Sequence, residues 1–278
     1  MITESIHKKI RVGGVPEHFN YPWIHLIQSG YFTKLGYEIE WQAFPGGTGA
    51  MSEALDANEI DLAVMLTEGS VKQIKDGKPF QILQKYISTP LIWGVFVEAN
   101  HQACSLEEIE ASTAAISRFG SGSHLMTYIL AERQGWNTDQ LSFLEVDDLD
   151  GGVKALKNQK ATYFLWEQFT TQPHVVNGNF KQIGTCPTPW PCFVVVSRSD
   201  RDSEMSEILS TILNHVNTFS ETLKAKNDTA GNIAKEFSLD VNEVKKWLEI
   251  TEWSQAKFTT NEFETVENKL AQVGILKK

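Results

Sequence analysis

Apolar runs of strand length alternate with helical patterns through about the first two hundred residues, and this alternation constrains the fold most. It is typical of βαβ units and a mostly parallel sheet, and so of an α/β protein. Strands are expected at Ile10–Val15, Glu38–Gln42, Leu62–Leu66, Phe80–Tyr86, Leu91–Val97, Ala114–Ser117, Leu141–Val146, Thr162–Leu165 and Phe193–Ser197. Helices between them are expected at Pro22–Gly30, Gly49–Ala57, Ser123–Gln134 and Gly151–Asn158, each with a glycine, proline or hydroxyl residue near its start.

After Ser197 the pattern predicts helices only. One helical face carries Met205, Ile208, Leu209, Ile212, Leu213, Val216 and Phe219. A later helix is expected to open at Asp240, because Glu243 follows at the spacing of a capping box.

A weak internal repeat suggests the domain plan. Ala54-Leu55 and the strand that follows parallel Ala155-Leu156 and its strand, at an offset of 101 residues. We therefore expect residues 1–93 to form the first part of lobe one, 94–195 to form lobe two, and 196–278 to return to lobe one as helices. The crossovers between the lobes are expected near Trp93 and Phe193.

Composition excludes several classes of protein. The 278 residues are enough for about two domains, and no apolar run approaches the roughly 18 residues of a membrane span. The net charge of −10 opposes nucleic acid and anionic membranes as partners. The N-terminal stretch lacks the features of a signal peptide, which predicts a cytoplasmic protein, or a periplasmic one if an export signal was removed.

The three cysteines, Cys104, Cys186 and Cys192, are too few for a disulfide framework. Cys186 and Cys192 flank Pro-Thr-Pro-Trp-Pro, a stiff loop that disfavours disulfide geometry. Both are expected to be reduced thiols with a packing role.

Two glycine-rich loops are expected where strands lead into helix N-termini, the place where open parallel sheets bind ligands. Residues 44–49 (FPGGTG) follow the second strand, and residues 117–123 (SRFGSGS) occupy the same position in the second lobe. Backbone N–H groups there can approach a ligand, and the helix dipole favours a negative group. Neither loop has the spacing of a dinucleotide or P-loop motif.

Acidic and aromatic residues are expected at the same ends of the strands. The acidic ones are Glu68, Asp147, Asp148, Asp150 and Glu167, and the aromatic ones are Tyr21, Trp93, Phe119, Trp166 and Trp190. Carboxylates favour a cation, whereas the rings can stack on a planar or cationic ligand.

The sequence has few patterns that are typical of catalytic sites. Ser123 and His124 are adjacent instead of forming a nucleophile and base, there is no G-x-S-x-G elbow, and the seven histidines lack metal-site spacing. The sequence predicts no catalytic residue, no metal and no cofactor, and it favours a protein that is not an enzyme.

Seven segments together resemble a known family: VGGVPEHFNYPW (12–23), FPGGTGAMSEAL (44–55), LTEGSV (66–71), PLIWGVFV (90–97), SRFGSGSHLM (117–126), YFLWEQFTT (163–171) and CPTPWPCF (186–193). They resemble the type 2 periplasmic-binding-protein fold, in the branch of ABC-importer solute-binding subunits for taurine, other sulfonates, nitrate and thiamine-pyrimidine precursors. The resemblance implies two Rossmann-like lobes joined by two crossover segments, a helical tail on lobe one, and Venus-flytrap closure on a ligand.

The same resemblance implies a set of ligand-binding residues. They are Asn20, Tyr21, Gly47, Thr48, Thr67, Glu68, Trp93, Arg118, Gly120, Ser121, Gly122, Ser123, Trp166 and Glu167. It also implies a monomer that binds a small molecule and hands it to an ABC transporter permease.

The hypotheses about the ligand differ in the charge that they predict for it. The helix N-termini and Arg118 favour an anion such as a sulfonate. Because a carboxylate buried without a partner is costly, Glu68 and Glu167 favour a planar, nitrogen-bearing ligand that is neutral or positive, with an aminopyrimidine as the best example. Three alternatives remain open: sulfonate or nitrate binding, an intracellular sensor, and a thiamine-pyrimidine biosynthetic enzyme. The last of these shares the fold but carries a cysteine-rich motif that this chain lacks.

Overall fold

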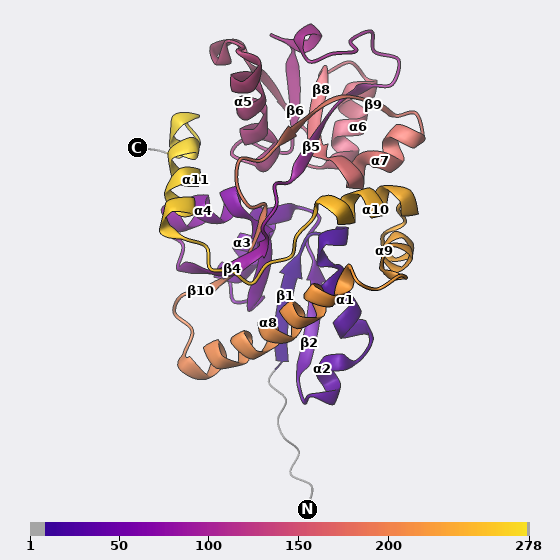
Figure 1. The fold of residues 1–278 in the computed structure, drawn as a ribbon. Helices are drawn as coiled ribbons and strands as arrows, with labels where there is room; N and C mark the ends of the chain where they lie inside the picture. The colour runs from indigo at the N-terminus through magenta and orange to yellow at the C-terminus, as the bar shows by residue number, and fades with distance from the viewer. Residues whose placement is uncertain (1–8, 277–278) are drawn as a thin grey trace, which may run out of the picture.

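The computed structural model describes residues 9–276 as two α/β lobes, one above the other in Figure 1. The strands are β1 (Lys9–Gly14), β2 (Glu38–Ala43), β3 (Leu62–Leu66), β4 (Phe80–Ile87), β5 (Ile92–Glu98), β6 (Thr113–Ile116), β7 (Ser142–Glu145), β8 (Tyr163–Glu167), β9 (Phe180–Pro187) and β10 (Phe193–Arg198). The α-helices are α1 (Tyr21–Gln28), α2 (Tyr31–Lys34), α3 (Gly47–Asp56), α4 (Thr67–Lys75), α5 (Gly122–Gln134), α6 (Leu149–Lys157), α7 (Gln168–Val176), α8 (Ser203–Leu223), α9 (Thr229–Phe237), α10 (Val241–Ile250) and α11 (Thr260–Gln272). Three short helices are η1 (His18–Asn20), η2 (Glu107–Ile109) and η3 (Thr138–Gln140).

The two sheets are built on one plan. The first has the strand order β2-β1-β3-β10-β4, and the second has the order β7-β6-β8-β5-β9. In each, the first three strands run parallel and the fourth is antiparallel to both of its neighbours. The expectation of mostly parallel sheets is confirmed, since only the fourth strand of each sheet runs in the opposite direction, because it arrives from the other lobe.

The internal repeat predicted from the sequence corresponds to this common plan. β3 begins at Leu62 and β8 at Tyr163, and the helices that follow begin at Thr67 and Gln168, so both pairs differ by 101 residues. Leu62, Ala63 and Val64 have no exposed surface, because Leu62 and Val64 pack in one hydrophobic cluster and Ala63 packs in another. A continuous apolar run is typical of such a strand.

The chain changes sheet twice, as predicted. It passes from β4 to β5 through residues 88–91, and from β9 to β10 through residues 188–192. The two crossovers are hydrogen-bonded to each other: the Thr188 N–H donates to the Leu91 carbonyl (2.9 Å), and the Cys192 N–H donates to the Thr89 carbonyl (3.1 Å). Ile92 and Trp93 lie in the second sheet and Phe193 in the first, close to the segment limits proposed from the sequence.

The thiols match their prediction. Cys186 and Cys192 are free and buried, and Cys104 is free and exposed. The proline-rich loop thus joins two lobes instead of closing a disulfide.

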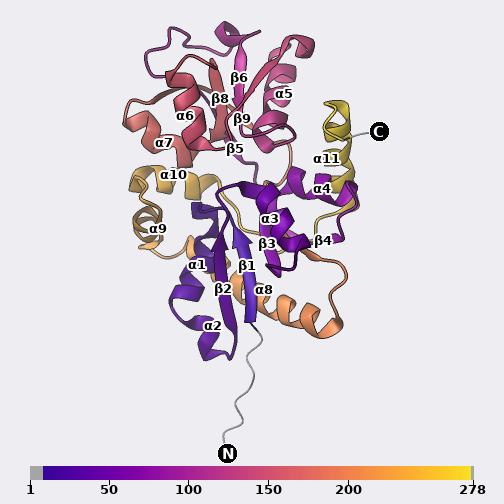
Figure 2. The same cartoon turned by 180° about the vertical axis from the view of Figure 1, so that it is seen from behind.

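The prediction of an all-helical tail on the first lobe is confirmed, and the tail extends further than predicted. α8 packs on α1 and α11 packs on α4, both in the first lobe, whereas α10 contacts α7 of the second lobe. Figures 1 and 2 show α10 and α11 on opposite sides of the junction between the lobes. Asp240 caps α10 as expected, by accepting hydrogen bonds from the N–H groups of Asn242 and Glu243.

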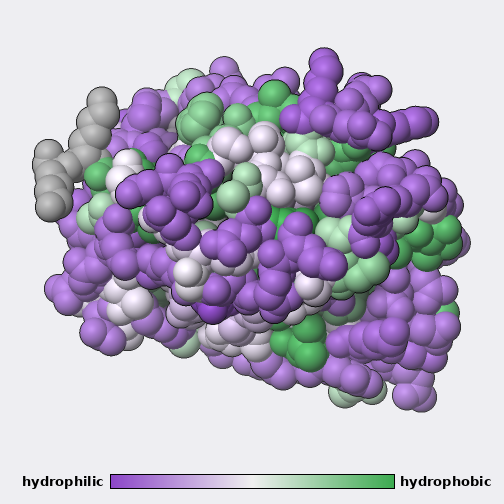
Figure 3. Space-filling model, turned by 90° about the horizontal axis from the view of Figure 1, so that it is seen from above, coloured by the Kyte–Doolittle hydropathy of each residue, from purple (hydrophilic) through white to green (hydrophobic). Residues whose placement is uncertain are grey.

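Two further observations concern the surface and the helices. Hydrophilic residues cover most of the face seen in Figure 3, with small separate hydrophobic patches among them. Within residues 9–276, no helix has both the length and the apolar character needed to cross a membrane.

Candidate functional site

A cavity of about 330 Å³ lies between the lobes, where the parallel strands of both sheets end. The loops after β1, β2 and β3 line it from the first lobe, and those after β6, β7 and β8 line it from the second. This is the position at which open α/β sheets bind ligands.

Most of the binding residues predicted from the sequence meet in this cavity. The predicted residues that line it are Gly47, Thr48, Glu68, Trp93, Arg118, Gly120, Ser121, Gly122, Ser123, Trp166 and Glu167. They come from both lobes, so neither lobe forms this surface alone.

Asn20, Tyr21 and Thr67 do not line the cavity; all three are buried in the structure of lobe one. The Asn20 amide donates to the Val15 carbonyl (2.8 Å), and the Tyr21 hydroxyl bonds with His25 Nδ1 (3.2 Å). The Thr67 hydroxyl donates to the carbonyl of Pro191. Each of the three thus uses a polar atom within the protein, whereas Asn20 Oδ1 is buried without a partner among the described residues.

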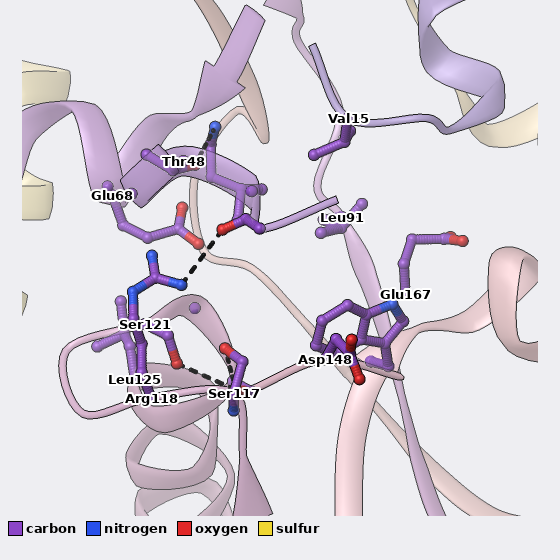
Figure 4. Close-up of a pocket in the computed structure, with 18 of the residues that line it drawn as sticks. Val15, Thr48, Glu68, Leu91, Ser117, Arg118, Ser121, Leu125, Asp148 and Glu167 are labelled. Atoms are coloured by element: carbon purple, nitrogen blue, oxygen red, sulfur yellow. Dashed lines mark hydrogen bonds between the residues drawn. The ribbon is translucent and has the colours of Figure 1, made fainter. Parts of the chain in front are cut away.

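Arg118 reaches across the cavity from the second lobe to the start of α3. Its Nη1 donates to the Gly46 carbonyl at 3.4 Å, as Figure 4 shows. A Cβ at Gly49 would lie 2.6 Å from Arg118 Nη2, so the glycine at this position lets the guanidinium approach the helix. Burial lowers the pKa of Arg118, and the nearby Glu53 and Glu145 oppose that shift.

The serines at the start of α5 bond mainly to their own loop. Ser121 is the N-cap and accepts from the His124 N–H (3.3 Å), and the Ser123 hydroxyl accepts from the Ser117 N–H (2.9 Å). This loop therefore has fewer free hydroxyl groups than its sequence suggests. At α3, by contrast, the N-cap Gly46 provides no side-chain hydrogen bond to the helix.

Glu68 has one oxygen bonded and one oxygen without a partner. Its Oε2 accepts from Trp190 Nε1 at 2.9 Å, whereas Oε1 has no hydrogen-bond partner among the described residues. The residue is only 3% exposed, and burial raises the pKa of its carboxyl to about 7. Trp190, which does not line the cavity, thus orients a carboxyl that does.

Two more carboxyl groups face the same cavity. Glu167 caps α7, with Oε2 accepting from the Thr170 N–H at 2.6 Å, and burial raises its pKa to about 7. Glu17 follows β1, and burial together with the charge of Glu167 raises its pKa to about 8. Desolvation of this kind favours the neutral form of a carboxyl.

Trp93 and Trp166 are aromatic residues of the wall, together with Phe193. The ring centroids of the two tryptophans are 6.5 Å apart and their planes are inclined by 74°. Trp93 is 4% exposed, and its Nε1 has no hydrogen-bond partner among residues 9–276. Phe119, by contrast, is 63% exposed and does not line the cavity.

Sequence reasoning missed several residues of the wall. They include Val15, Glu17, Lys72, Gln73, Leu91, Leu125, Thr170, Phe193 and Leu270. Glu17 follows the predicted strand Ile10–Val15, so it could have been found in the same way as Glu68, whereas Leu91 is the first residue of a predicted strand. Leu270 could not have been found in this way, because it comes from the helical tail.

The described residues contain no group of three or more His, Cys, Asp or Glu side chains that could hold a metal ion. Asp147, Asp148 and Asp150 do line the cavity, but all three are exposed, and Asp148 caps α6 by accepting from the Gly151 N–H (2.8 Å). These three carboxylates form a polar, exposed part of the cavity wall.

Comparison with known proteins gives one family model and many solved structures. Residues 93–186 match a model described as Ca3427-like PBP. No curated protein matches the chain. The Candida albicans CA3427 gene product, described as having the generic periplasmic binding protein fold, is 24% identical, with 98% of this chain and 92% of that chain covered and a TM-score of 0.86.

Two other solved structures are similar over nearly the whole chain at 13% identity. The alkanesulfonate-binding protein SsuA from Xanthomonas axonopodis pv. citri, bound to MOPS, has a TM-score of 0.82, with 99% of this chain and 96% of that chain covered. The ligand-binding component of an ABC-type import system from Staphylococcus aureus, with zinc bound, has a TM-score of 0.77 and coverages of 97% and 93%. The resemblance inferred from the sequence is thus confirmed for the fold: this chain has the two-lobed fold of the periplasmic binding proteins.

Proposed function

We propose that the protein binds one small solute in the cavity between its lobes, without turning it over, and that the lobes close on the solute. The observation that carries this proposal is a set of buried polar atoms in residues of the cavity wall that have no partner within residues 9–276: Glu68 Oε1, Trp93 Nε1 and Thr170 Oγ1. A buried polar atom left unpaired costs about 1–3 kcal/mol. A bound solute that pairs with these atoms recovers that cost.

The proposed ligand is planar, nitrogen-bearing and neutral or positive, and an aminopyrimidine fits best. An amino group can donate to Glu68 Oε1 and a ring nitrogen can accept from Trp93 Nε1, while Trp166 provides an aromatic face. In their ionised forms, the carboxyls of Glu17, Glu68 and Glu167 oppose an anion. Tyr21, which the sequence suggested as a stacking partner, is excluded from this role because it does not line the cavity.

A small sulfonate is the second candidate, and Arg118 is the observation that favours it. Arg118 and Lys72 both line the cavity, and the start of α3 has no side-chain cap. A helix N-terminus and a guanidinium together suit an anionic group. The similarity to a sulfonate-binding protein bound to MOPS supports the same candidate.

Titration calorimetry with cytosine and with methanesulfonate separates the two candidates. We expect heat with cytosine and at least a tenfold loss of affinity in Glu68→Gln, with Glu59→Gln, an exposed carboxyl outside the cavity, as the matched control. Methanesulfonate binding that survives Glu68→Gln, with no cytosine heat, would support the anion site and refute the aminopyrimidine.

Mass spectrometry of the recovered solute tests whether the protein is an enzyme. We expect the solute to leave unchanged, since the adjacent Ser123 and His124 provide no catalytic arrangement: Ser123 bonds to Ser117, while His124 Nδ1 accepts from the Gly120 N–H. A new mass would favour the biosynthetic alternative. An ABC permease partner, or a partner that reads the closed form as a sensor output, is consistent with the same binding step.

A further inference from the structure

The C-terminal helix α11 contacts both lobes beside the cavity. It lies alongside α4 in the first lobe, and Figure 1 shows its far end reaching the level of α5 in the second lobe. Within the first lobe, Lys75 pairs with Glu267 (2.7 Å) and Lys85 pairs with Glu262 (2.7 Å). A capping box formed by Thr259 and Glu262 fixes the start of the helix.

One carboxyl connects α11 to the second lobe. Glu132, in α5, pairs with Lys269 and accepts from the side-chain amide of Gln272 at 2.8 Å. The Lys269 and Glu132 side chains are 23% and 29% exposed, so their pairing is only partly screened by solvent. Glu132 therefore holds two side chains of α11 with its two oxygens.

Leu270 lies between these two residues and lines the ligand cavity. It is 2% exposed, and it belongs to a hydrophobic cluster that also includes Leu125 of α5. Val266, one turn earlier, is fully buried but does not line the cavity. The helix thus presents one apolar side chain to the cavity and two polar ones to Glu132.

We propose that α11 is a third wall of the binding site, in which Leu270 contacts the solute and Glu132 is the positioning residue that fixes this wall to the second lobe. The contact with the solute rests on the proposed function, whereas the attachment to the second lobe does not. Opening of the lobes must break both bonds to Glu132 or carry α11 away from α4. The attachment therefore slows opening and the exchange of solute.

Hydrogen exchange of the protein without any solute tests the attachment. Glu132→Gln keeps the shape of the side chain but removes its charge, and we expect about three- to tenfold faster exchange in residues 260–272. Glu267→Gln, which breaks a contact within the first lobe, is the control for loss of an ion pair on the same helix. Equal exchange of residues 260–272 in Glu132→Gln and wild type would overturn the attachment.

The association and dissociation rates of cytosine test whether α11 forms a wall of the binding site. Glu132→Gln should speed dissociation about three- to tenfold with little change in the association rate, and Leu270→Ala should relax discrimination against a larger, alkylated cytosine. Val266→Ala removes a comparable buried side chain from the same helix without touching the cavity, so it controls for stability. Unchanged discrimination in Leu270→Ala would overturn the contact with the solute. If neither cytosine nor methanesulfonate binds the wild type, the proposed solutes fail, and the exchange experiment still decides the attachment.

Discussion

Individual carboxyl groups account for much of the character of the cavity. Glu68 and Glu167 were predictable from the sequence, because each lies at the end of a buried strand next to the cavity: Glu167 ends β8, and Glu68 comes two residues after β3. The roles of their neighbours were not predictable. Asn20, Tyr21 and Thr67 occupy equally suitable positions in the sequence, but they are buried away from the cavity and hydrogen-bonded to Val15, His25 and Pro191. Such pairings depend on packing between distant segments.

The raised pKa of Glu68 predicts a pH dependence of stability. The pKa is about 7 in the folded protein and 4.5 for the unperturbed group, so the native state binds more protons between these values. Stability should therefore fall as pH rises from about 4.5 through 7. Glu68→Gln cannot ionise, and we expect it to exceed the wild type in stability by about 1–3 kcal/mol at about pH 8 and to match it near pH 5. Urea unfolding checks this, with Glu59→Gln as control; the same difference from wild type at both pH values would contradict the burial of Glu68.

Substitution of Gly49 by alanine should change the affinity for the solute without lowering the stability of the protein. In Gly49→Ala, the new Cβ meets Arg118 Nη2 and displaces the guanidinium from the Gly46 carbonyl. The helix itself gains about 0.5–1 kcal/mol, because alanine is the better helix former. We expect a several-fold change in solute affinity without loss of thermal stability. Gly231→Ala, in α9 with open space around the glycine, is the control; equal affinities in both variants would refute a role for Arg118 at the site.

At the scale of elements, the sequence predicted most strands of the sheets but missed β9. Its residues, FKQIGTCP, are mostly polar or small, and β9 is an edge strand paired only with β5, so its pattern lacks apolar alternation. The repeat could have found it, since Phe80 of β4 and Phe180 of β9 begin equivalent strands about one repeat apart. The contacts of α10 and α11 with the second lobe were beyond local patterns, because they join segments that are far apart in the sequence.

The burial of two cysteines beside the second crossover predicts the reactivity of the thiols. Cys186 and Cys192 are buried at the two ends of the second crossover, and burial raises the pKa of Cys186 to about 11. Because the thiolate is the reactive form, only Cys104 should react quickly in the folded protein. Thiol titration should give three free thiols after unfolding without reductant. A single thiol would show that the crossover contains a disulfide.

The arrangement of the whole molecule predicts a change of shape. Residues from both lobes line the cavity, and two hydrogen-bonded crossovers connect the lobes, so solute binding should close them by rotation about the crossovers. The radius of gyration from small-angle X-ray scattering should decrease on saturation with cytosine, or with methanesulfonate if that is the solute. An unchanged radius at saturation would argue against closure.

Hydrogen exchange with and without saturating cytosine tests the central claim, that one solute is held by both lobes, most directly. The account predicts slower exchange in both lobes together, at residues 44–49 and 66–73 of the first lobe and 117–125 and 166–170 of the second. Protection confined to one lobe, or to surfaces outside these loops, would contradict it.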